Sequence, residues 1–172
     1  SGHGLKLILD VMLNEVASDG SFAACNYSWF RFAPSGEDRL PDPRQFGIPR
    51  DAAIARFDDA SVAEELADSW IQHLTGWAHL GVAGFRCVEA QRIPAAVWRR
   101  IIVEVRRRAP DCRFLAAVPA DSAIETLGFD HILWPLPGAG QDPVALVEDY
   151  ERLRQAAPPI AVPEVPFGPR LA

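Results

Sequence analysis

The residues GVAGFRCV, at positions 81–88, predict a short buried β-strand that follows a glycine turn. Apolar positions recur at helical spacing on both sides of this strand, at residues 59–80 and 94–108. The first of these helices has Ser61 as its expected N-cap, with Glu64 three residues later. The second begins near a proline and ends in arginines, which are favourable residues at those two helix ends. Residues 81–88 are therefore expected to form a strand between two helices.

The same alternation of strand and helix extends in both directions along the chain. Residues 143–156 predict a further helix, and apolar runs predict four more strands, at residues 5–11, 113–118, 129–133 and 160–162. Short, nearly continuous apolar strands joined by helices are typical of a parallel sheet with right-handed crossovers. A doubly wound sheet and a (β/α)8 barrel both meet this description, so the pattern alone leaves these two α/β folds open.

One long loop is expected to interrupt the pattern, at about residues 19–58, where Gly, Pro, Ser and Asn recur without a clear period. No internal repeat divides the chain, and we interpret residues 1–172 as a single unit. A complete (β/α)8 barrel typically takes about 250 residues. Because only five strands are predicted, a closed eight-stranded barrel is not expected from this chain alone.

The composition indicates a globular chain and disfavours several classes of partner. The 172 residues are 49% hydrophobic, which is enough to form a core, and carry a net charge of −6. This mild acidity disfavours nucleic acid, and no apolar stretch reaches the roughly 18 residues that a membrane span requires. The cysteines, Cys25, Cys87 and Cys112, are too few and too scattered for a disulfide framework or a zinc site. An odd cysteine count without a visible secretion signal favours a reducing, cytoplasmic location.

Four segments resemble the signature motifs of the α-amylase superfamily, glycoside hydrolase family 13. GLKLILDVMLNEV (residues 4–16) is similar to GLKVILDVVxNH of the third barrel strand, and GVAGFRCVEA (residues 81–90) to GVxGFRCDAA of the fourth. FLAA (residues 114–117) resembles FLAE of the fifth strand, and residues 162–172 resemble the seventh-strand segment FPExHDTxRLA. Trp29-Phe30 is similar to PDWF of the loop after the third strand. The resemblance implies a partial (β/α)8 TIM barrel, strands three to seven, near the bacterial intracellular glucan-acting, maltosyltransferase-like members.

The resemblance also implies which positions carry the glycosidase chemistry, and this chain departs from the family at each of them. A retaining glycosidase uses two carboxyl groups about 5–5.5 Å apart, one as nucleophile and one as general acid/base. Val88 stands at the nucleophile position and Ala117 at the acid/base position. Phe167 replaces the third carboxylate, Pro166 replaces its neighbouring His, and Glu15 replaces a His that contacts sugar hydroxyls in the family. No catalytic position is intact, because an isopropyl group forms no glycosyl ester and a methyl group has no proton to give.

Other positions of the family's motifs are kept. Asp10, Asn14 and Arg86 are present, and the resemblance implies that Asp10 and Arg86 lie close together on neighbouring strands. A structural, charge-assisted pair is the expected interpretation, with a retained sugar contact as the alternative. Trp29 and Trp134 offer rings that can stack on a sugar, with packing in a loop or in the core as the alternative. We predict Asp10, Asn14, Arg86 and Trp29 as the substrate-binding set.

Two further carboxylates, those of Glu15 and Glu89, stand near the lost catalytic positions. Glu89 follows Val88 directly. Because successive side chains of a strand point to opposite sides, Glu89 is expected to face away unless the strand end bends. Solvated charges at the rim are the expected interpretation of Glu15 and Glu89, and a relocated catalytic pair is the alternative.

Three functions from different classes stay open. The first is a catalytically inactive domain of carbohydrate-metabolism ancestry with a structural or interaction role, whose barrel is completed by a protein partner or by the remainder of a longer chain. The second is a non-catalytic module that binds an α-glucan or a maltooligosaccharide. The third is an active α-glucan hydrolase or transglycosylase with relocated carboxylates. In each case we expect no cofactor, no metal, and no nucleic-acid or membrane partner.

Overall fold

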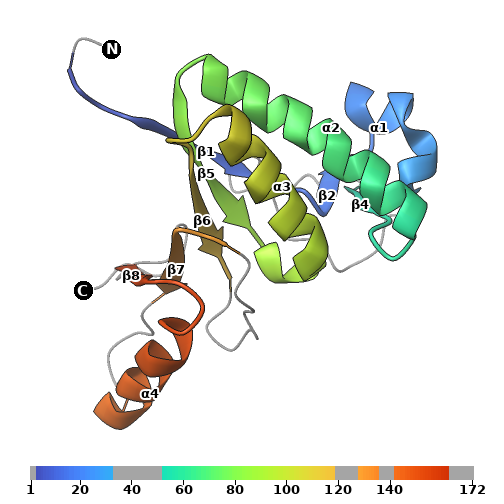
Figure 1. The fold of residues 1–172 in the computed structure, drawn as a ribbon. Coiled ribbons are helices and arrows are strands. Elements are labelled where there is room, and N and C mark those ends of the chain that lie inside the picture. Colours follow the sequence, from blue (N-terminus) through green and yellow to red (C-terminus); the bar gives the residue numbers. More distant parts are fainter. Residues whose placement is uncertain (1–2, 33–51, 119–127, 136–141, 163–172) are drawn as a thin grey trace.

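The computed structural model describes residues 3–32, 52–118, 128–135 and 142–162. Five of its described strands form a parallel sheet in the order β1-β5-β6-β7-β8 (Figure 1). These strands are β1 (Leu7–Val11), β5 (Val82–Val88), β6 (Arg113–Ala117), β7 (His131–Pro135) and β8 (Pro159–Val162). Each coincides with an expected strand apart from small differences at its ends. The prediction of an α/β fold with parallel strands alternating with helices is confirmed.

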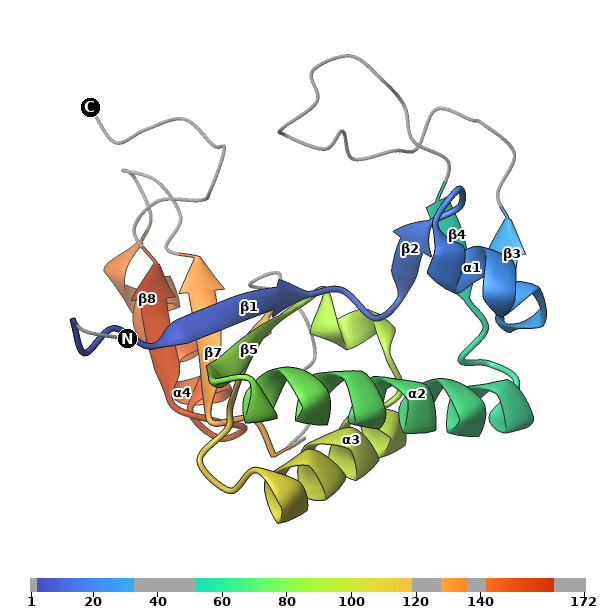
Figure 2. The ribbon, with the colours of Figure 1, turned by 90° about the horizontal axis from the view of Figure 1, so that it is seen from above.

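Two long helices, α2 (Ala60–His79) and α3 (Ala95–Arg108), lie side by side, whereas α4 (Pro143–Leu153) lies apart from them beside β7 and β8 (Figures 1 and 2). The rings of Trp77 on α2 and Phe85 on β5 are 6.3 Å apart, so α2 covers the sheet face that carries Phe85. The largest fully buried side chains come from both layers, and include Leu66, Leu74, Phe85, Trp98, Ile101 and Phe114. The core therefore lies between the parallel sheet and the α2–α3 pair.

The N-terminus of α2 is capped by Asp59. Its Oδ1 accepts hydrogen bonds from the backbone nitrogens of Ser61, at 3.1 Å, and Val62, at 3.3 Å. The prediction of Ser61 as the cap is wrong, since Ser61 lies inside the first turn and its own N–H needs an acceptor. Asp and Ser cap helices about equally well, so residue type alone does not choose between the two.

A second, antiparallel sheet lies at one end of α2 (Figure 2). Its described strands, in the order β2-β4-β3, are β2 (Glu15–Ala17), β4 (Ala52–Ala55) and β3 (Phe30–Phe32). The short helices α1 (Ser21–Cys25) and η1 (Tyr27–Trp29) join β2 to β3. The prediction of one long loop over residues 19–58 is therefore wrong at both of its ends, while residues 33–51 lie outside the described residues. Strands of three or four residues are too short to show a period, and β4 pairs with segments far from it in the sequence.

Gly84 allows β5 and β6 to approach each other closely. A Cβ atom at Gly84 would lie 2.6 Å from the carbonyl oxygen of Arg113, its register partner on β6. Any other residue would push the two strands apart, so the register of the sheet centre depends on this glycine.

Among the described residues, no helix has the length and the apolar character needed to cross a membrane.

Candidate functional site

The strand register brings Val88 and Ala117, which the motif resemblance predicts at the positions of the two catalytic carboxylates, side by side. Val88 of β5 pairs with Ala117 of β6, Ala117 with Leu133 of β7, and Leu133 with Ile160 of β8. Register partners on neighbouring strands point to the same side of a sheet. Because side chains alternate along β5, Val88 lies on the face opposite to Phe85, and so opposite to α2.

We call Val88, Ala117, Leu133 and Ile160 the apolar row. Val88, Ala117 and Leu133 are half-buried, and Ile160 is more open to solvent, at 38% exposed. The row crosses four of the described strands, and Val88 and Ala117 are the last residues of β5 and β6, at the sheet end where ligands bind in α/β folds. It contains no group that can give or accept a proton or attack an acetal carbon.

One layer below the apolar row, Asp10 and Arg86 form a two-pronged ion pair. They are register partners on β1 and β5. Arg86 Nε donates to Asp10 Oδ1 at 2.7 Å, and Arg86 Nη2 donates to Asp10 Oδ2. The predicted charge-assisted pair is confirmed. The Asp10 side chain is still 57% exposed, so the pair is open on one side.

A second polar group, which we call the rim cluster, consists of Asn14, Glu15, Glu89 and Arg92. Asn14 Nδ2 donates to Glu89 Oε2 at 3.2 Å and to Glu15 Oε1 at 3.5 Å. Arg92 forms ion pairs with both carboxylates, through Nε to Glu89 at 2.9 Å and through Nη1 to Glu15 at 3.3 Å. The rim cluster joins β2 of the small sheet to the end of β5, since Glu15 belongs to β2 and Glu89 follows Val88.

Glu89 reaches the rim cluster because the chain turns sharply after β5. Its φ of 53° is in the left-handed region, which few residues other than glycine adopt. This bend of the strand end is the condition under which Glu89 was not expected to face away, and it carries the carboxylate to Asn14 and Arg92. The Glu15 and Glu89 side chains are 30% and 18% exposed, and both are ion-paired rather than simply solvated.

Arg92 was not among the predicted site residues. It lies in the 3-10 helix η2 (Ala90–Arg92), three residues after Glu89. That spacing is a usable local signal for an ion pair. Its second contact, to Glu15, spans 77 positions of the sequence and could be seen only in the folded chain.

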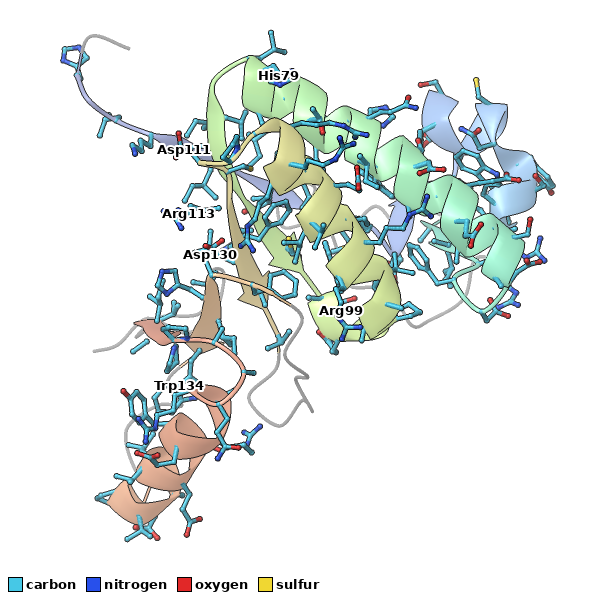
Figure 3. All side chains as sticks on the ribbon, in the orientation of Figure 1. His79, Arg99, Asp111, Arg113, Asp130 and Trp134 are labelled. Carbon is cyan, nitrogen blue, oxygen red and sulfur yellow. The ribbon has the colours of Figure 1, made fainter. Side chains whose placement is uncertain are left out.

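The two candidate tryptophans lie elsewhere. Trp29 Nε1 donates to Glu65 Oε2 of α2 at 2.5 Å, and its ring contacts Phe22 at a centroid distance of 6.2 Å. In the described part of the chain these contacts hold Trp29 against α1 and α2. Trp134 is 6% exposed on β7 (Figure 3), so for this residue packing is the correct alternative.

The last two predicted positions, Pro166 and Phe167, lie outside the described residues. Within the described ranges, no group of three or more His, Cys, Asp or Glu side chains could hold a metal ion.

Comparison with known proteins shows what this chain is similar to. No protein-family model matches the chain. The alpha-1,4-glucan:maltose-1-phosphate maltosyltransferase of Burkholderia pseudomallei is 30% identical over 175 residues, which cover 99% of this chain and 15% of that protein. The chain thus spans about 15% of the length of this curated relative.

Solved structures show the same fold. An α-amylase from Lactobacillus plantarum matches with a TM-score of 0.54 and 18% identity, over 90% of this chain and 36% of the amylase. A maltogenic amylase from S. marinus matches with a TM-score of 0.58 and 13% identity, over 90% of this chain and 29% of that enzyme. The chain therefore has a partial α-amylase-like fold, and its sequence is similar to that of the maltosyltransferases.

Proposed function

We propose that this chain is a non-catalytic α-amylase-like domain with a structural or interaction role. The apolar row carries this proposal. Val88 and Ala117 are register partners at the two positions where the family has its nucleophile and its acid/base. Double displacement at an acetal needs a carboxylate to attack and a carboxylic acid to protonate the leaving group. Neither group is present at these two positions.

The rim cluster does not replace the missing pair. A retaining mechanism needs one of its two carboxyl groups protonated and the other free to attack. Glu15 and Glu89 instead share one guanidinium, that of Arg92, which contacts both carboxyl groups. Both carboxyl groups also accept hydrogen bonds from Asn14 Nδ2, so they are engaged with groups of the protein itself. We infer that the cluster supports the structure.

A sensitive hydrolysis assay with an aryl maltoside tests the proposal. We expect no turnover by the wild-type chain above that of a mock preparation. The variants Glu15→Gln and Glu89→Gln are the matched controls, since each removes one carboxylate with little change in size. Wild-type turnover that falls in either variant would show that the relocated pair is active, and the proposal would be wrong.

Binding of an α-glucan is a second candidate function, favoured by the Asp10–Arg86 pair. The pair lies on the same sheet face as the apolar row, and the Asp10 side chain is 57% exposed. Charged and amide side chains beside exposed apolar groups are suited to the hydroxyls and the apolar faces of a sugar ring. The name of the Burkholderia relative includes an alpha-1,4-glucan, which makes maltooligosaccharides the ligands to test.

Titration with maltotetraose, followed by calorimetry and by amide chemical shifts, separates this function from a purely structural one. If maltotetraose binds beside the Asp10–Arg86 pair, the amide chemical shifts of Asp10, Asn14 and Arg86 should change. An Arg86→Met variant should lose these changes. Arg107→Met is a suitable control, because Arg107 pairs only with Glu104 of its own helix among the described contacts. Absence of both heat and shift changes at millimolar sugar would remove this second candidate.

A further inference from the structure

The backbone of Glu89 is strained where the rim cluster joins the small sheet to the parallel sheet. Its φ is 53° and its ψ is 39°, and among the described residues it is the one non-glycine residue with a positive φ. In this conformation the Cβ atom comes too close to the carbonyl oxygen that follows it. The contacts of the Glu89 carboxyl group with Asn14 and Arg92 therefore hold the backbone in a conformation that it would otherwise leave.

Asn14 carries a buried acceptor without a donor. The residue is 4% exposed, and its Oδ1 has no hydrogen-bond partner among the described residues. Turning the amide round does not help, because Nδ2 lies beside the carboxyl oxygens of Glu15 and Glu89, which are themselves acceptors. A buried polar atom without a partner destabilises the state in which it is buried. The rim cluster thus satisfies the donor of Asn14 and leaves its acceptor unpaired.

The rim cluster also has two acidic side chains and only one basic side chain. Arg92 contacts Glu89 at 2.9 Å and Glu15 at 3.3 Å, and among the described residues neither carboxyl group has a second basic partner. The Arg92 side chain is 54% exposed, so solvent weakens both ion pairs. The contact with Glu15, which is the longer of the two, contributes less.

The small sheet has a second attachment, to α2, that does not involve the rim cluster. Trp29 Nε1 donates to Glu65 Oε2 of α2 at 2.5 Å, and the rings of Phe22 and Trp70 are 5.6 Å apart. The chain also connects β4 to α2 directly, through residues 56–59 (Figure 2). Separation of the rim cluster would therefore leave the small sheet attached to α2.

We propose that the rim cluster is a strained latch with a closed and an open state. In the closed state, which the structure shows, it holds the small sheet to the end of β5. In the open state Glu89 leaves the left-handed region, Asn14 Oδ1 meets solvent, and the small sheet stays on α2. Strained and unpaired groups of this kind are found together at elements that change state.

Opening gives the chain a movable element beside the apolar row, because Glu89 directly follows Val88. The latch rests on the contacts of the rim cluster and not on the absence of turnover proposed above. Either proposal can therefore fail without the other.

Amide hydrogen exchange of the full chain tests the latch, since opening exposes amides of β2 and β4. Glu15→Gln places an amide of the same size beside Asn14. This amide can donate to Asn14 Oδ1 and accept from Nδ2, while only the longer Arg92 contact is lost. We expect exchange in β2 and β4 to slow by about threefold or more, and exchange in β6 to stay unchanged. A cluster that only supports the structure predicts the opposite sign, because a contact has been removed.

Glu104→Gln is the matched control for this substitution. Glu104 also contacts arginines, Arg107 and Arg108, but these contacts lie within α3. The variant should leave exchange in β2 and β4 as it is in the wild type.

Glycine at position 89 isolates the backbone strain. Glu89→Gly and Glu89→Ala lose the same carboxyl group, but only glycine adopts a φ of 53° without strain. We expect exchange in β2 and β4 to be slower in Glu89→Gly than in Glu89→Ala, by about threefold. At Gln91, where φ is not positive, glycine should give the faster exchange of the two. Exchange that is unchanged or faster in Glu15→Gln, or equal in the two variants of Glu89, would overturn the proposal.

Discussion

At the scale of single residues, Asp130 shows how one carboxylate orders the amino-terminal side of the sheet. It is 13% exposed and accepts hydrogen bonds from the Phe114 backbone nitrogen and from Arg106 Nη2, both at 2.7 Å, and from Arg113 Nη1 at 2.9 Å (Figure 3). Burial by itself would raise the pKa of Asp130, but the hydrogen bonds from Phe114, Arg113 and Arg106 outweigh it and lower the pKa. The ionised carboxylate thus ties β6 to α3 and to the start of β7.

Replacing Asp130 by Asn should lower the free energy of unfolding by about 2 kcal/mol at pH 7, since the Phe114 N–H and two guanidinium groups lose an ionised acceptor. A lowered folded-state pKa means that the stabilisation is present above the unfolded-state pKa of about 3.9 and is lost as the pH falls through the folded-state value. Urea unfolding of both proteins at pH 7 and at pH 3 measures the difference. The gap should shrink at the lower pH, and Asp111→Asn, an exposed neighbour, should show none. A gap independent of pH would contradict this role of the ionised form.

The thiols are a second case in which position decides chemistry. Burial raises the pKa of Cys87 well above its usual value and raises the pKa of Cys112 to about 11, whereas Cys25 is exposed on α1. Because the thiolate is the reactive form, a maleimide at about pH 8 should label Cys25 in the folded protein and all three thiols only after unfolding. Peptide mass spectrometry gives the site of labelling. Labelling of Cys87 at the rate of Cys25 would show that β5 opens easily.

At the scale of elements, the start of α2 depends on a single side chain. Asp59 accepts two N–H groups of the first turn and also pairs with Arg56 at 2.8 Å. We expect Asp59→Ala to lower the free energy of unfolding by about 1–2 kcal/mol, because capping residues contribute that much. Ser61→Ala, two residues further along the chain, should change the free energy of unfolding very little. Thermal or urea unfolding of both variants measures this, and a larger loss in Ser61→Ala would reverse the assignment of the cap.

At the scale of the whole molecule, the rim cluster is the polar link between the two sheets. Glu15 belongs to the small antiparallel sheet, Glu89 follows β5 of the parallel sheet, and Arg92 pairs with both. The backbone supports the same junction, since Ala55 N donates to Asn14 O at 2.8 Å. The rim cluster therefore attaches the small sheet to the end of β5.

Substituting Arg92 by Gln should therefore loosen the small sheet with little effect on the centre of the parallel sheet. We expect faster amide hydrogen exchange in β2 and β4, and unchanged exchange in β5 and β6, because ion pairs with Glu15 and Glu89 are lost at the junction only. Arg107→Gln is the control, since its ion pair lies within α3. Exchange that rises equally in all strands, or in none, would show that the cluster does not hold the sheets together.

The sequence by itself determined the five parallel strands, their helices and the likeness to the α-amylase fold. These features depend on periods and motifs that lie within short stretches, such as residues 81–88, and local pattern is what a sequence records directly. It also predicts that Val88 and Ala117 stand at the family's catalytic positions, where neither residue type can supply a carboxyl group.

Only the tertiary structure decided what surrounds those two residues. The small antiparallel sheet, the pairing of Glu15 with Arg92 and the row from Val88 to Ile160 all join segments that are distant in the sequence. The direction of Glu89 depends on one backbone angle after β5, which no residue type there predicts. Contacts of this kind form because the folded sheet sets the register of its strands, and a one-residue change of register would separate every one of these pairs.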